Sequence, residues 1–134
     1  MRGAWALVLA ASIFAGNALA STIEYTVTDL GTLGGDASTA TGINDNGQVV
    51  GFSNVTPGAL HKEAFLWSNG TMQGLGYFAG LPAYLNSSKA YGINAAGQVV
   101  GGSSGPGGGG AFVYSNGTMT DIGAFGANAI NDSG

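Results

Sequence analysis

The sequence contains no cysteine, a single histidine and only ten charged side chains among its 134 residues. The lack of cysteine excludes a disulfide-stabilised scaffold, a cysteine-ligated zinc site, a thiol nucleophile and a lipid anchor attached through a cysteine. Three basic residues against seven acidic ones give no electropositive surface suited to nucleic acid, so we expect no nucleic-acid partner. The length allows at most one ordinary domain.

Glycine and β-forming residues are what the chain has in abundance. It has 26 glycines, and 45% of its residues are hydrophobic, with 10% aromatic. A disordered chain would carry far fewer apolar side chains, because it does not bury enough of them to offset the entropy of ordering. The composition therefore indicates a folded protein despite the glycine.

The first twenty residues have the three-part layout of a secretory signal peptide. Met1 and Arg2 form a positively charged start, residues 4–16 are an apolar run, and the small residues Ala18 and Ala20 stand where a signal peptidase reads. We expect cleavage between Ala20 and Ser21. A transmembrane anchor is the alternative, but this run is shorter than the roughly 20 residues needed to cross a bilayer core. The mature chain is expected to be extracellular or periplasmic, with no membrane span.

The rest of the chain repeats itself. Residues 42–51 return as 92–101 and begin again at 129–134, and residues 64–72 return as 111–119. A shorter element at 29–31 recurs at 74–76 and 121–123. Periods of this size are typical of solenoids, propellers and other arrays. The repeat predicts one unit at about 36–76, a second at about 88–123, and a third that begins at 127–134.

Each unit reads as two β-hairpins. Asn-Gly pairs, the strongest short hairpin signal, stand between runs of Val, Ile, Phe, Trp, Tyr and Thr. No stretch of the mature chain has the apolar period of a helix. The sequence therefore predicts an all-β fold, with tandem four-stranded antiparallel sheets. The expected turn residues are Asn46, Gly47, Asn69, Gly70, Asn116 and Gly117.

Tandem four-stranded sheets of this kind are typical of the blades of a β-propeller, which is the architecture that the sequence favours. Apolar runs such as Ala64-Phe65-Leu66-Trp67 do not alternate with polar residues, so these strands are expected to be covered on both faces. A β-solenoid is the competing architecture, although its coils repeat over shorter spans. The alternating stretch 23–30 resembles the last strand of another blade. Propellers need about four to eight blades, so we expect this chain to be the front part of a longer protein.

Three motifs together resemble the extracellular HAF-family repeats of bacteria, whose repeats are β-propeller-like. They are Asp-Leu-Gly-Thr-Leu-Gly-Gly from residue 29, Ile-Asn-x-x-Gly-Gln-Val-Val-Gly from residue 43, and Ala-Phe-Leu-Trp-x-x-Gly-x-Met from residue 64. The resemblance covers residues 25–134. Where the family has the His-Ala-Phe tripeptide that names it, this sequence has Glu63 and Gly110 in place of the histidine. The resemblance implies a secreted or surface repeat protein.

A search for catalytic or metal-binding groups finds no convincing set. His61, the sole histidine, lies in a variable spacer, where a solvated loop residue is the expected role. The carboxylates at 29, 121, 45 and 132 recur in some copies and are replaced by Gly74 or Ala95 in others. This favours turn chemistry over a glycosidase pair or a calcium site. We expect no catalytic residue, metal or cofactor.

The spacers between the repeated elements are the expected binding surface. The spacers at 54–63, 77–89 and 102–110 differ between units, and insertions in repeat proteins collect on one rim. The glycine-rich run 105–110 precedes a strand, so it reads as a flexible spacer and not as a phosphate loop. The sequence predicts a secreted, non-enzymatic protein with a binding or structural role, whose partner is a polysaccharide or another surface protein. The alternative is part of a secreted carbohydrate-active propeller with its catalytic residues outside this segment.

Overall fold

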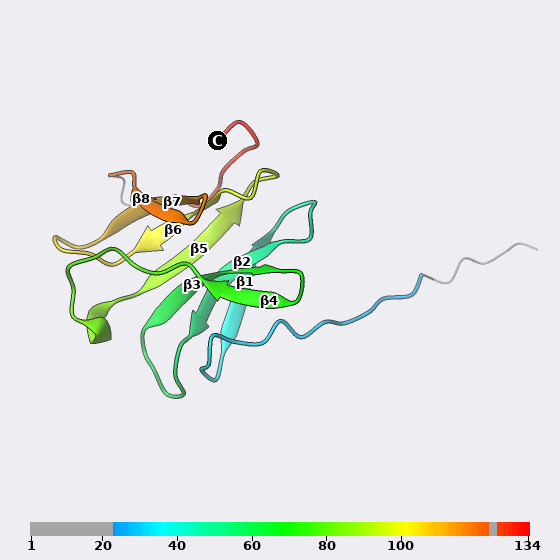
Figure 1. The fold of residues 1–134 in the computed structure, drawn as a ribbon, viewed down its shortest axis with the longest axis horizontal. Coiled ribbons are helices and arrows are strands. Elements are labelled where there is room, and N and C mark those ends of the chain that lie inside the picture. Colours follow the sequence, from blue (N-terminus) through cyan, green and yellow to red (C-terminus); the bar gives the residue numbers. More distant parts are fainter. Residues whose placement is uncertain (1–22, 124–125) are drawn as a thin grey trace, which may run out of the picture.

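The computed structural model describes residues 23–123 and 126–134 (Figure 1). The expected signal peptide, with its cleavage point between Ala20 and Ser21, lies outside the described residues. The described chain forms two four-stranded sheets, each a simple meander in which sequence neighbours pair antiparallel. The all-β prediction, with tandem four-stranded antiparallel sheets, is thereby confirmed.

The strands fall at equivalent places in the two units. The first sheet contains β1 (Ser38–Ile43), β2 (Val49–Asn54), β3 (Lys62–Ser68) and β4 (Thr71–Gly74). The second contains β5 (Ser88–Ile93), β6 (Val99–Ser103), β7 (Gly110–Ser115) and β8 (Thr118–Asp121). A three-residue 3-10 helix, η1 (Ala83–Leu85), lies in the connection between the sheets. No pattern in the sequence indicated this short helix.

The register is the same in both units, down to the irregularities. Ile43 pairs with Val49 in the first sheet and Ile93 with Val99 in the second, and both first strands have a bulge two to three residues before that pair. A Cβ added at Gly51 or at the matching Gly101 would collide with backbone of the neighbouring strand. Glycine is therefore required where the first two strands of each sheet approach most closely.

Two kinds of turn join the hairpins. Asn69 and Gly70 both have positive φ (50° and 81°), which matches a two-residue turn of type I′. Asn116 and Gly117 repeat this turn between β7 and β8. The turn after β1 is different, because Asn46 is not among the residues of positive φ, and only Gly47 takes that conformation. Three residues separate Asn44 from Gln48 there, so glycine is needed only at the last position.

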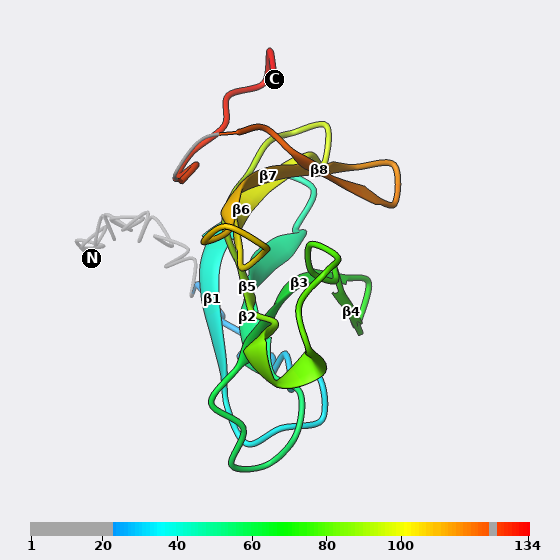
Figure 2. The ribbon, with the colours of Figure 1, turned by 90° about the vertical axis from the view of Figure 1, so that its left-hand side faces the viewer.

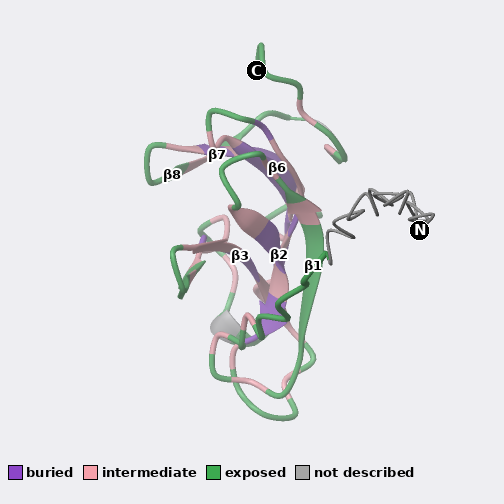
Figure 3. Cartoon of the chain, turned by 90° about the vertical axis from the view of Figure 1, so that its right-hand side faces the viewer, coloured by how far each residue is buried: buried purple, intermediate pink, exposed green. Residues whose placement is uncertain are grey.

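The core lies between the two sheets. β5 packs against β1, β2 and β3 of the first sheet, as Figure 2 shows. Val50, Ala64 and Phe65 in the first unit and Ala90, Val99 and Phe112 in the second are at most 1% exposed. Burial is concentrated in the middle strands, whereas β1 is largely exposed (Figure 3). The apolar runs that lack alternation are thus the strands that carry the core.

A ladder of asparagines joins the units at the end where the first hairpin of each sheet turns. Asn44 Nδ2 donates to the carbonyl of Asn94 at 3.0 Å, and Asn94 Nδ2 donates to the carbonyl of Asn131 at 3.0 Å. Each of these two amides also donates to the glutamine four residues later, at 2.7 Å. The repeated Ile-Asn element therefore fixes its own turn and also bonds to the next unit.

Residues 23–30 form no strand with the described part of the chain. Ile23, Tyr25 and Val27 are 72%, 86% and 94% exposed, so the alternation that predicted a strand is present without a neighbouring strand to pair with in the described ranges. The segment ends in an ordered contact, because Ser38 Oγ donates to the carbonyl of Gly31 at 2.8 Å. Ser88 Oγ donates in the same way to Gly76.

Candidate functional site

The topology collects the long, variable connections at one end of the molecule. In a meander, every second connection lies at the same end of the sheet. The connections 55–61 and 104–109 within the two sheets, and 75–87 between them, therefore lie opposite the asparagine ladder. We call this the spacer end. It contains most of the three spacers that the sequence predicted to differ between units.

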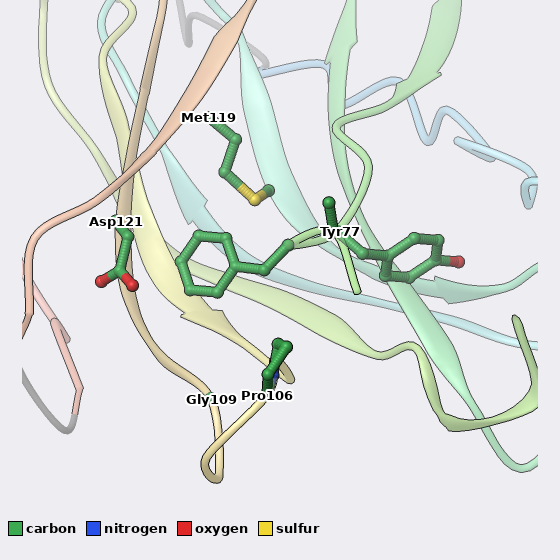
Figure 4. A pocket seen from close by; sticks show the side chains of 8 residues that line it. Tyr77, Pro106, Gly109, Met119 and Asp121 are labelled. Carbon is green, nitrogen blue, oxygen red and sulfur yellow. The ribbon is translucent and has the colours of Figure 1, made fainter. Parts of the chain in front are cut away.

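The first hollow of the spacer end lies between the connections 75–87 and 104–109 and β8 (Figure 4). It has a volume of about 460 Å³, and its lining includes Phe78, Pro106, Met119 and Asp121. The backbone N–H of Phe78 donates to Ser103 Oγ at 3.0 Å, which ties the connection 75–87 to the end of β6. The hollow is open and combines apolar surface with one carboxylate.

A second hollow of about 330 Å³ is lined mostly by hydroxyl groups and glycine backbone. Its polar side chains are Ser87, Ser88, Lys89, Tyr91, Ser103 and Ser104. Hydroxyls both donate and accept hydrogen bonds, and glycines leave the backbone accessible. Such a surface suits a ligand that itself has many hydroxyl groups.

Both lysines of the described chain converge on one aromatic ring. Lys62 Nζ lies 4.9 Å from the centre of the Phe52 ring, and Lys89 Nζ lies 5.1 Å from it. These three residues, which we call the lysine cluster, come from β3, β5 and β2 and so span both sheets. An ammonium group within about 6 Å of an aromatic ring is attracted to its electron-rich face. The ring thereby concentrates the positive charge of an otherwise acidic protein.

Glu63 is held by two hydrogen bonds at the same end. Its Oε1 accepts from the backbone N–H of Gly76 at 3.0 Å, and its Oε2 accepts from the Tyr77 hydroxyl at 3.1 Å. Burial, followed by the negative charge of Glu63 and its hydrogen bond, raises the pKa of Tyr77 well above its ordinary value. Both carboxylate oxygens are thus engaged with neighbours in the chain.

Asp36 is the second engaged carboxylate near the lysine cluster. The Asn54 side chain donates to Asp36 Oδ1, and the backbone N–H of Gly58 donates to Oδ2 at 3.3 Å. The hydrogen bond from Asn54, then that from Gly58, holds the pKa of Asp36 below its ordinary value, and the charge of Lys62 adds to this. Asn54 Oδ1 is buried and has no hydrogen-bond partner among the described residues.

The structure places the remaining sequence candidates in local roles. Asp29 and Asp121 each accept a hydrogen bond from the glycine two residues later, at 2.9 and 2.8 Å, as turn chemistry requires. Asp132 accepts from the backbone N–H of Ala95. His61 lies in the loop before β3 and is partly buried. In the described ranges no three His, Asp or Glu side chains group as a metal site would require.

Sequence reasoning missed the lysine cluster and the role of Glu63. The only available signal for the cluster was positional. Lys62 and Lys89 are the only basic residues after the expected signal peptide, and each lies at or near the start of a strand that follows a spacer. Their meeting on Phe52 depends on the packing of one sheet against the next, which the sequence pattern does not specify.

No family model, curated protein or solved structure matches the chain. Within the part of the chain that the structure describes, no helix has the length and apolar character needed to cross a membrane.

Proposed function

We propose that this protein is a secreted or cell-surface β-repeat scaffold that binds a polysaccharide or another surface protein at its spacer end. The supporting observation is the contrast between the two ends of the units. The turn end repeats the same bonds in successive units and has a hollow of about 180 Å³. The spacer end differs between units and contains the two hollows of about 460 and 330 Å³. Repeat scaffolds conserve the residues that join units and vary the loops that meet ligands.

In this proposal the sheets are propeller-like blades of the HAF-repeat type. The contact of Ser38 with Gly31 supports it, because the matching Ser88 meets the segment that leaves β4. Gly31 therefore meets the first strand of the first sheet as Gly76 meets the first strand of the second. The signal-peptide pattern that the sequence shows at residues 1–20 supports a location outside the cytoplasm.

The proposal is tested with the exported chain, screened for both binding and turnover on a panel of neutral and acidic polysaccharides. Saturable binding without product supports a binding role. Product formation would instead identify a carbohydrate-active enzyme and overturn the non-enzymatic proposal. A second measurement is the intact mass of the exported protein, which should correspond to a chain that begins at Ser21.

A further inference from the structure

The lysine cluster is the one concentration of positive charge in the described chain. The formal net charge of the protein is −4, yet its only two lysines point their ammonium groups at the same ring. Their distances to the ring centre put the two nitrogens no more than about 10 Å apart. Two like charges at this separation repel one another, and an anion between them would relieve that repulsion.

The oxygens of the two carboxylates near the cluster already accept hydrogen bonds from groups of the chain other than the lysines. The oxygens of Glu63 accept from Gly76 and Tyr77, and those of Asp36 accept from Asn54 and Gly58. Lys62 also acts on Asp36 through its charge, but this is the smallest of the causes that lower the pKa of Asp36. Both lysines are partly buried against Phe52, so their charges are screened less than those of fully solvated lysines. The cluster is therefore equipped for an external anion.

The surroundings of Lys89 indicate what else the anion carries. Lys89 lines the second hollow together with Ser87 and Tyr91. The Ser104 hydroxyl, which also lines it, already bonds to backbone groups of Leu85 and Ser87. Sugar hydroxyls exchange hydrogen bonds readily with serine and tyrosine hydroxyls and with exposed glycine backbone. A dense polyanion such as nucleic acid does not suit this surface, because two lysines in an acidic chain cannot neutralise a run of phosphates.

We propose that the lysine cluster and the hydroxyl-lined hollow form a binding site for acidic sugars. The sugar carboxylate binds at the Lys62 and Lys89 ammonium groups, and the sugar hydroxyls bind in the hollow. Phe52 holds the two lysine side chains over its ring. This inference rests on the proposed binding role of the spacer end and adds to it the chemical class of the ligand.

The test measures binding of a galacturonic acid trimer to the full chain by calorimetry, with the neutral galactose trimer as its uncharged counterpart. The acidic trimer should bind and the neutral trimer should bind at least tenfold more weakly, because a charge-assisted hydrogen bond is about twice as strong as a neutral one. K62M and K89M should each weaken the acidic trimer about tenfold, and K62R should stay within about threefold of the unaltered protein.

Q73E is the matched control, because it shifts the net charge by the same amount as K62M but lies at an exposed position on β4. Q73E should bind the acidic trimer with an affinity within about twofold of that of the unaltered protein. If the K62M/K89M double variant, verified as folded by its circular dichroism, binds the trimer like the unaltered protein, the proposal is overturned. Tighter binding of duplex DNA than of the trimer would also overturn it.

Failure of this inference is distinguishable from failure of the proposed function. If neutral polysaccharides bind at the spacer end and the acidic trimer does not, the binding role is supported and the acidic-sugar site is overturned. If no polysaccharide or surface protein binds, both fall. Inorganic sulfate should displace the trimer only at millimolar concentration. Displacement at micromolar sulfate would show a site for a bare oxyanion and overturn the sugar assignment.

Discussion

Glu63 does for Gly76 what an aspartate does in the flanking copies of the repeat. In those copies Asp29 and Asp121 each accept a hydrogen bond from the glycine two residues later, but the middle copy has Gly74 at the aspartate position. Glu63 supplies the missing carboxylate from the neighbouring strand, and a Cβ on Gly74 would collide with it. One chain thus contains two solutions to the same backbone requirement.

This exchange predicts strong coupling between positions 63 and 74. E63G leaves the Gly76 N–H without its acceptor and should destabilise the fold by about 1–2 kcal/mol. G74D should also destabilise it, because the new side chain meets Glu63. The double variant reproduces the Gly110 and Asp121 arrangement of the second unit and should recover most of the loss. Urea unfolding of all four proteins measures the coupling, and additive losses would contradict the interpretation.

Tyr77 predicts a loss of stability in alkali. The pKa of Tyr77 is raised in the folded protein above the ordinary value of 10.0. The protonated side chain therefore contributes fully to the free energy of unfolding below pH 10, and this contribution is lost as the pH rises further. The Y77F variant should therefore lose less stability than the unaltered protein between pH 9 and pH 11. Chemical unfolding at a series of pH values measures this. E63Q should reduce the effect in part, since the charge of Glu63 is the second cause.

For Asp36 we expect the opposite pH dependence, a loss of stability in acid. Its folded pKa lies below the ordinary value of 3.8, so the carboxylate contributes stability above that pH, and the contribution is lost as the pH falls further. Both D36N and N54A should flatten the fall of unfolding free energy below pH 4, because the bond from Asn54 is the largest cause. Thermal melts from pH 2.5 to pH 6 provide the measurement. An unchanged slope in both variants would refute the assignment.

Asn94 is the most consequential residue of the asparagine ladder. It is 2% exposed and bonds to the Gln98 side chain, the Gln98 N–H and the carbonyl of Asn131. N94A should cost about 1–3 kcal/mol, because it leaves the partly buried Gln98 side chain and N–H and the Asn131 carbonyl without their partner. N46A is the control, since Asn46 is exposed and makes one side-chain bond to the next unit. Its cost should stay near 0.5 kcal/mol or less. Denaturant midpoints distinguish the two.

The sheets could be predicted from the sequence because their determinants are local. The Asn69-Gly70 turn and its β-forming flanks specify a hairpin with no information from the rest of the chain. Residues 23–30 show the limit of this reasoning. Their alternation is typical of a strand, but a strand also needs a neighbour, and no pairing partner lies in the described ranges.

The position of the spacers at one end could be predicted, but the contacts there could not, because they join residues that only the folding of the sheets brings together. Lys62 and Lys89 belong to different sheets, and their common ring belongs to a third strand. Glu63 reaches Gly76 across a hairpin, where the repeat pattern assigns the role to an aspartate. The sequence does show that the middle copy has Gly74 where the other copies have an aspartate. This difference indicated turn chemistry, but it did not indicate that Glu63 takes over the role of the aspartate.

The asparagine ladder gives the array a polarity. In both contacts the side-chain amide belongs to the earlier unit and the carbonyl to the later one. At the ladder, the two flanks of a unit are therefore chemically unlike, one with an amide donor and the other with a carbonyl acceptor. Units joined head to tail satisfy both groups, whereas units joined head to head would oppose donor to donor or acceptor to acceptor. This rule governs the addition of a further unit on either side, from the same polypeptide or from a separate one.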